Sequence, residues 1–312
     1  MKLYLGHKSA LDYWCWNDVP SRLQMRKIQN VTFSAPTPDL IRFAQAELDP
    51  HKTPFHIVVA HENDKRNLKN ICCHSISNPI PPYSFFRHSA HVAVSSPEAC
   101  FLQLALTTDP ISLIYIGCEL CGTYSIDPIS GEILNRRPRT KLAFLHAYLN
   151  RADRIRGSIK ARKALTHILE NSASPMETKI ALLLSLPTSM GGYGIPQPDL
   201  NAQVTHSFSG ARHPERFRCD LYWPTVKLAL EYDSHQYHAS SEKVVLDSTR
   251  RMKIESKKIH VLSVTKQQIY NPSEFEKLVA VIARYLSHRI RINRKDFNQR
   301  RQHLRAKLGF PG

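Results

Sequence analysis

The sequence predicts an α/β protein with more than one domain. Phe217 to Trp223 alternates between apolar and polar residues, and Val226 to Leu230 is largely apolar. These patterns predict two strands joined by a turn at Pro224-Thr225. A helix start at Ser174-Pro175 precedes this hairpin, and another apolar strand, Ile259 to Val264, follows it. The 312 residues are enough for two domains with separate cores.

The predicted hairpin carries two acids. Asp220 lies inside its first strand and Glu231 near the end of its second, so antiparallel pairing brings both carboxylates to one end of a sheet. Such neighbours repel, and burying them without a partner costs on the order of several kcal/mol. A hard divalent cation resolves this conflict, because it takes carboxylate oxygens and leaves positions for water and phosphate. The pair therefore predicts a site for Mg²⁺ or Mn²⁺; the alternative is two solvated acids at strand ends.

Several residues of this region match a known pattern: Asp220, the strand Leu228 to Asp233, the pair Tyr237-His238, and Asp247 with Arg250. They resemble the very-short-patch-repair (Vsr-like) endonuclease branch of the PD-(D/E)XK nuclease superfamily, over about residues 175 to 285. The resemblance implies a restriction-endonuclease-like mixed sheet flanked by helices. It also implies metal-dependent phosphodiester hydrolysis by a helix Glu, a strand Asp and a (D/E)xK strand.

By this resemblance the catalytic residues are Glu177, Asp220, Glu231, Asp233 and His238, and the metal ligands are Asp220, Glu231 and Glu177. The chain departs from the pattern at Asp233, which stands where Lys is usual and cannot supply its positive charge. His238 is the candidate for proton transfer instead. The plainer alternatives are a first-turn Glu177 favoured by the helix dipole, a turn residue at Asp233 and an ordinary polar side chain at His238.

The charge of the chain indicates a polyanionic partner. Lys and Arg number 43 against 26 Asp and Glu, a net charge of +17, which predicts salt-sensitive attraction to nucleic acid. The expected DNA contacts are Arg154 and Arg156, together with Lys243, Arg250, Arg251 and Lys253 on a helix predicted from Ser241 to Lys257. For that helix a solvated face is the alternative.

Other partner classes have less support. No apolar run approaches the roughly 18 residues of a membrane span, and the N-terminus lacks the apolar region of a signal peptide, so we expect a cytoplasmic protein without a membrane partner. The seven cysteines show no disulfide framework. Cys118 and Cys121 with Cys72-Cys73-His74 suit a zinc site, but core thiols are the favoured interpretation.

Residues 1–140 predict a smaller α+β accessory domain. Its expected elements are helices opening at Ser9, Thr37-Pro38 and Ser96, and strands over Phe55 to Ala60 and His91 to Val94. Ser95 to Cys100 and Gly117 to Tyr124 are similar to AbiEi-type antitoxin and transcriptional-regulator proteins. This resemblance implies a module that presents the nuclease to a target or partner; a structural α/β domain is the alternative.

The remaining boundaries complete the expected organisation. Residues 141–173 form a basic helical connector broken at Gly157-Ser158, residues 174–287 the nuclease domain, and residues 288–312 a basic tail. The sequence thus predicts a metal-dependent DNA endonuclease, for which a homodimer is one compatible assembly. The rival is a catalytically inactive DNA-binding regulator or antitoxin-like protein on a nuclease fold, and a nuclease acting on RNA is a third reading.

Overall fold

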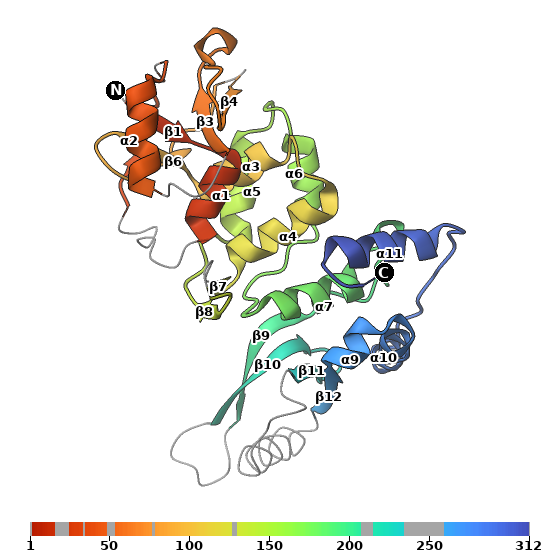
Figure 1. Cartoon of the computed structure of the whole chain (residues 1–312). Coiled ribbons are helices and arrows are strands. Elements are labelled where there is room, and N and C mark those ends of the chain that lie inside the picture. Colours follow the sequence, from red (N-terminus) through yellow and green to blue (C-terminus); the bar gives the residue numbers. More distant parts are fainter. Residues whose placement is uncertain are drawn as a thin grey trace. The chain divides into compact units, whose positions relative to one another are not determined.

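The computed structural model describes residues 2–15, 25–33, 35–48, 54–76, 79–126, 130–206, 215–233 and 259–311. These residues form a mixed α/β protein, which confirms the predicted class. The chain divides into two compact units, Met1–Ile168 and Leu169–Gly312 (Figure 1). The first unit is the longer, although the sequence predicts a smaller N-terminal domain, and it includes the helices of the predicted connector.

The first unit is built on a six-stranded mixed sheet with the order β2-β5-β6-β1-β3-β4. The strands are β1 (Leu3–Leu5), β2 (Lys27–Ile28), β3 (Phe55–Val59), β4 (Ile71–Ser75), β5 (Phe85–Arg87) and β6 (Val92–Ser95). Strand β1 pairs in parallel with β6, as β3 does with β4, and the other neighbours are antiparallel. The central strands β1 and β6 are wholly buried, as expected of strands covered on both faces.

Helices surround this sheet (Figure 1). They are α1 (His7–Cys15), α2 (Pro38–Leu48), α3 (Pro97–Leu104), α4 (Pro110–Cys121), α5 (Leu142–Arg151) and α6 (Ser158–Leu165), with a 3-10 turn η1 (Glu62–Asp64). Helices α1 and α3 pack against the sheet and against each other, and α4, α5 and α6 pack behind α3. A short hairpin of β7 (Tyr124–Ile126) and β8 (Ile133–Asn135) follows α4.

The predicted helix starts are partly correct. The Ser96 hydroxyl accepts a hydrogen bond from the Ala99 N–H and caps α3, as predicted. The N-cap prediction at Ser9 is wrong, because α1 already begins at His7, whose φ is +49°. The Ser9 hydroxyl instead accepts a 2.8 Å hydrogen bond from the backbone N–H of His56 and ties α1 to β3.

Gly157 separates α5 from α6, which confirms the predicted break. Its φ is +90°, a left-handed conformation that glycine adopts without a steric penalty. The chain therefore turns between two short helices rather than continuing as one. Both helices bury an apolar side in the first unit, with Leu145, Leu149 and Leu165 among the core residues.

The second unit contains a four-stranded sheet with the order β12-β11-β10-β9. The strands are β9 (Asp199–His206), β10 (Glu215–Trp223), β11 (Leu228–Asp233) and β12 (His260–Thr265). The antiparallel pairing of β10 with β11 confirms the predicted hairpin, and β12 pairs with β11 in parallel. The turn between β10 and β11 closes with a hydrogen bond from the Lys227 N–H to the Pro224 carbonyl.

Helices also line this unit: α7 (Pro175–Ser185), α9 (Lys266–Tyr270), α10 (Pro272–Tyr285) and α11 (Phe297–Lys307), with the 3-10 turn η2 (Thr188–Met190). Helix α11 lies in the predicted basic tail, yet it is an integral part of the fold. Arg305 is only 1% exposed and donates hydrogen bonds to the carbonyls of Ile269 and Tyr270. Arg300 and Arg294 both pair with Asp296. Part of the basic tail therefore belongs to the packed fold of this unit.

In the part of the chain that the structure describes, no helix has the length and apolar character needed to cross a membrane.

Candidate metal centre

The two acids predicted as metal ligands lie on neighbouring strands of the second unit. Strands β10 and β11 pair through Leu221 and Leu230, and one step further in this register Asp220 lies opposite Glu231. The Asp220 carboxylate accepts a 2.9 Å hydrogen bond at Oδ2 from the backbone N–H of Tyr232, the residue after Glu231. The carboxylate of Asp220 is thereby held against the strand that carries the second acid.

Strand β9 adds a residue that the sequence reasoning missed. The register that pairs Cys219 with Ala202 leaves Asp220 opposite Asn201. Asn201, Asp220 and Glu231 therefore form one row across three adjacent strands. A single Asn carries no functional signal of its own in the sequence, and its place in the row depends on the strand register.

Glu177 reaches the same place from the first turn of α7. The Ser174 hydroxyl accepts a hydrogen bond from the Glu177 N–H, and Oε2 of Glu177 accepts one of 2.8 Å from the Ala173 N–H. The same Oε2 accepts a 2.5 Å hydrogen bond from Nδ2 of Asn201. The Glu177 carboxylate is thus both part of the helix cap and the support of the Asn201 amide.

Burial and the nearby charge of Asp220 both act on the pKa of the Glu177 carboxyl group. Burial raises the pKa of the Glu177 carboxyl, and the neighbouring negative charge of Asp220 raises it further. Hydrogen bonds from Ala173, Asn201 and Ser174 oppose the increase without cancelling it. The structure therefore brings Glu177 and Asp220 within electrostatic reach of each other.

The other predicted catalytic residues are less closely joined to this group. Asp233 is exposed at the end of β11, where it lies opposite Thr265 of β12. His238 lies outside the described residues, as do Lys243, Arg250, Arg251 and Lys253.

The row of residues fits a hard divalent cation. Among the described residues no three His, Cys, Asp or Glu side chains gather so as to hold a metal ion. Mg²⁺ does not need three such side chains, since it usually binds through one or two carboxylates and completes its coordination shell with water and substrate phosphate. Asp220 and Glu231 supply that number, and Oε1 of Glu231 is a buried oxygen. Glu177, the third predicted ligand, has its Oε2 engaged in the two hydrogen bonds described above.

The predicted DNA contacts Arg154 and Arg156 lie in the first unit, in the segment between α5 and α6. Both side chains are exposed, and with Lys160 and Lys163 they line a shallow depression of about 550 Å³. Asp153 is the acid of this depression and forms an ion pair with Arg162. The surface is therefore mainly basic, which suits a phosphate backbone.

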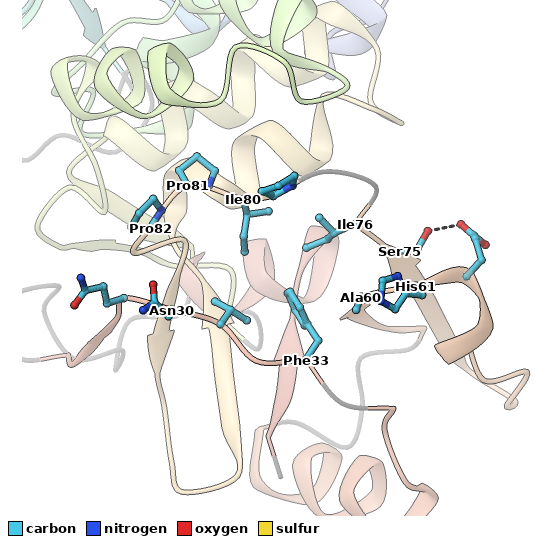
Figure 2. A pocket seen from close by; sticks show the side chains of 13 residues that line it. Asn30, Phe33, Ala60, His61, Ser75, Ile76, Ile80, Pro81 and Pro82 are labelled. Atoms are coloured by element: carbon cyan, nitrogen blue, oxygen red, sulfur yellow. Dashed lines mark hydrogen bonds between the residues drawn. The ribbon is translucent and has the colours of Figure 1, made fainter.

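The first unit also holds a larger pocket of about 630 Å³ (Figure 2). Its walls are both apolar and polar: Phe33, Ile76 and Ile80 face it, Pro81 and Pro82 lie along one side, and Asn30 and His61 also line it. A hydrogen bond from the Ser75 hydroxyl to Glu62 forms its polar side. The pocket offers shape and apolar surface but no arrangement of acids like that of the second unit.

A histidine cluster borders a second cavity of about 260 Å³ in the same unit. Nδ1 of His56 and Nε2 of His74 lie 2.9 Å apart, and the ring of His7 stacks on that of His74 at 3.6 Å between centroids. Burial, reinforced by the two neighbouring histidines, lowers the pKa of His7 to about 3. His7 is therefore neutral near pH 7, as expected of a packed polar residue.

The cysteines considered for zinc lie on elements of the first unit. Cys118 and Cys121 are buried in α4, and Cys72 and Cys73 lie on β4. None of them belongs to a metal-holding group of His, Cys, Asp or Glu within the described ranges.

Comparison with known proteins gives a partial relationship. The chain is 30% identical over 131 residues to two proteins of Mycobacterium tuberculosis, the uncharacterized protein MT2308 of strain CDC 1551 / Oshkosh and the uncharacterized protein Rv2248 of strain ATCC 25618 / H37Rv. The similarity covers 42% of this chain and 44% of each relative, so it spans less than half the length of the proteins it matches. No family model matches the chain, and no solved structure matches it significantly.

Proposed function

We propose that the second unit is a metal-dependent DNA endonuclease that hydrolyses phosphodiester bonds, with Mg²⁺ or Mn²⁺ as its cofactor. The observation that carries the proposal is the cross-strand pair of Asp220 and Glu231. The buried Glu177 lies near this pair, and the charge of Asp220 raises the pKa of its carboxyl group. Neighbouring acids at one end of a sheet repel each other, and a bound divalent cation relieves that repulsion.

The order of elements supports this proposal. Helix α7 precedes three antiparallel strands, and β12 returns in parallel beside β11. The Vsr-like resemblance implies the same order of helix, strands, helix and strand. The second helix of that order, predicted from Ser241 to Lys257, lies outside the described residues.

Each residue of the centre has a proposed task. A divalent cation bound there supplies an activated water and neutralises charge on the phosphate. Asp220 and Glu231 hold it, and the N–H of Tyr232 keeps the Asp220 carboxylate in one orientation. His238 is the proposed group for proton transfer, because Asp233 occupies the position where the resemblance places Lys.

Exposed basic residues are proposed to bind the DNA backbone. Arg154 and Arg156 serve this purpose in the first unit, and Lys243, Arg250, Arg251 and Lys253 in the second. Contacts to phosphates provide affinity and position but no choice of sequence.

Cleavage of supercoiled plasmid in Mg²⁺ tests the proposal. We expect wild-type protein to nick the plasmid and Asp220→Ala to lose at least about a hundredfold in rate, because a ligand of the cation is missing. DNA binding measured in EDTA is the control and should be unchanged, since Asp220 makes no phosphate contact without the ion. Equal nicking by both proteins, or no nicking by well-folded wild-type protein that binds DNA, contradicts the proposed function.

A second candidate is a DNA-binding regulator or antitoxin-like protein that uses a nuclease fold without catalysis. The observation in its favour is Asp233, an exposed acid at the position of the motif Lys. Metal-independent DNA binding without nicking, and a footprint upstream of its own gene, would favour this function. Digestion of matched DNA and RNA substrates distinguishes the DNA endonuclease and the DNA-binding regulator from a nuclease that acts on RNA.

A further inference from the structure

The backbone of Asn201 is unusual for its position. Its φ is +51°, in the left-handed region, although it lies within strand β9. Asn tolerates this region better than most residues other than Gly, yet the conformation is unfavourable in a strand and persists only where the surroundings enforce it. Such strain is concentrated at functional sites, and Asn201 lies beside Asp220 in the row across the sheet.

Two acceptors fix the orientation of the Asn201 amide. Its Nδ2 donates to the backbone carbonyl of Asn171 at 2.9 Å and to Oε2 of Glu177 at 2.5 Å. Turning the amide over would place its oxygen against both of these oxygens. The hydrogen-bond network therefore settles which end of the amide is Nδ2 and which is Oδ1.

The other end of the amide is a buried acceptor. Oδ1 of Asn201 is shielded from solvent and has no hydrogen-bond partner among the described residues. A buried oxygen without a partner is unfavourable, and in native proteins it calls for an explanation. Asp220 is its neighbour in the row and Glu231 lies one strand further, so a cation bound over this row would satisfy the amide oxygen and both carboxylates together.

We propose that Asn201 is a third protein ligand of the divalent cation, through Oδ1, and that Glu177 is a positioning residue that acts through the Asn201 amide. The inference rests on the proposed function of the second unit and names the ligands of that same centre. It differs from the Vsr-like expectation, in which the helix Glu itself is a metal ligand. The neutral amide oxygen adds a hard ligand without adding a third negative charge.

Calorimetric titration with Mn²⁺ tests this assignment without relying on activity. Asn201→Gly removes the amide but accepts the positive φ, and we expect it to weaken Mn²⁺ binding at least about tenfold. The matched control is Asn171→Gly, because Asn171 is also left-handed, with a φ of +64°, and its hydrogen bond to Asn201 is made by its backbone carbonyl. We expect this control to bind Mn²⁺ as wild-type protein does.

A second variant separates a ligand from a merely structural amide. Asn201→Asp keeps side-chain oxygen but by itself would place a second carboxylate against Oε2 of Glu177, so it is combined with Glu177→Gln, whose amide can donate a hydrogen bond to the new carboxylate. We expect this double variant to bind Mn²⁺ within about threefold of wild-type protein, and thermal unfolding without metal confirms that each variant is folded. A loss for this double variant as large as that for Asn201→Gly shows that a side-chain oxygen at position 201 does not support metal binding, and it overturns the ligand assignment.

The outcomes also distinguish this inference from the function beneath it. If wild-type protein binds Mn²⁺ and nicks DNA, Asp220→Ala loses both, and Asn201→Gly loses neither, only the assignment of Asn201 is wrong. If wild-type protein binds no Mn²⁺, or Asp220→Ala binds it equally well, the metal centre and the role of Asn201 are wrong together.

Discussion

The carboxyl group of Glu177 lies in a place that water reaches poorly, which disfavours its charged form. Its side chain is buried on the first turn of α7, and the charge of Asp220 is close by, so the pKa of the Glu177 carboxyl is raised. The folded protein consequently keeps this proton to a higher pH than the unfolded chain. Unfolding releases a proton in the window between the ordinary Glu pKa and the raised one, and stability falls as the pH rises through that window.

We expect Glu177→Gln to remove this contribution in metal-free protein. Gln keeps an oxygen for the Ala173 and Asn201 N–H groups but does not titrate. As the pH rises from the ordinary Glu pKa of about 4.3 through the raised pKa, the free energy of unfolding in urea should fall in wild-type protein relative to the variant. All other titrating groups are shared and serve as the internal control. A difference between the two proteins that stays constant over this range contradicts the raised pKa.

At the scale of single residues, the sequence predicts the acids of the centre but not their support. Strand periodicity brings Asp220 and Glu231 together because the register of a hairpin follows from its turn. Asn201 depends on a pairing with β9 and on a positive φ, neither of which appears in a pattern of apolar residues. Residues 177 and 201 are also far apart in the sequence, so a local pattern of apolar residues does not predict their contact.

The secondary-structure elements likewise divide into those that local sequence patterns predict and those that they do not. The buried strands and the Ser96 and Ser174 helix caps follow from local patterns, because periodicity and capping are local physics. Helix α11 does not, since its many basic residues suggest a solvated tail. Its structure depends on Arg305, whose guanidinium is buried against carbonyls of another element.

Helix α11 docks closely on the turn after η2. Gly191 has a φ of +93°, and a Cβ at this position would run into the backbone carbonyl of Arg300. Arg300 in turn donates a 3.0 Å hydrogen bond to the Ser189 carbonyl. Gly194 provides a contrast, because its φ is +66° but no described atom lies within 4 Å of the same position.

We expect the two glycines to differ in their effect on stability. Gly194→Ala meets only the left-handed backbone penalty and should destabilise by about 1 kcal/mol. Gly191→Ala adds a clash with rigid backbone and should destabilise by about 3 kcal/mol or more. Urea unfolding monitored by circular dichroism measures both free energies. Equal losses would show that α11 does not approach the turn as closely as described.

For the molecule as a whole, charge is the dominant feature. A net charge of +17 favours association with a polyanion, but the basic residues do not contribute equally. Arg294 and Arg300 pair with Asp296 and hold its pKa well below the usual range. Arg154 and Arg156 are exposed and border a mainly basic depression of the first unit.

The exposed, mainly basic surroundings of Arg154 and Arg156 predict that these two arginines contribute most to the salt dependence of DNA binding. Replacing both Arg154 and Arg156 with Ala should reduce the slope of log K against log salt by about 2, as expected for two lost phosphate contacts. Replacing Arg294 and Arg300 with Ala removes the same charge and should change the slope less. Fluorescence anisotropy with a duplex over a range of salt concentrations gives both values. Equal slopes for the two double variants would refute the assigned DNA contacts.

The rate of Mg²⁺-dependent plasmid nicking by Asp220→Ala, by Glu231→Gln and by the double variant tests the metal centre most directly. If both carboxylates act on one cation, each single variant loses nearly all activity and the double variant loses no more than the worse single. Wild-type rates in either single variant contradict a shared centre. So do partial losses that multiply in the double variant, because they would show two acids acting independently.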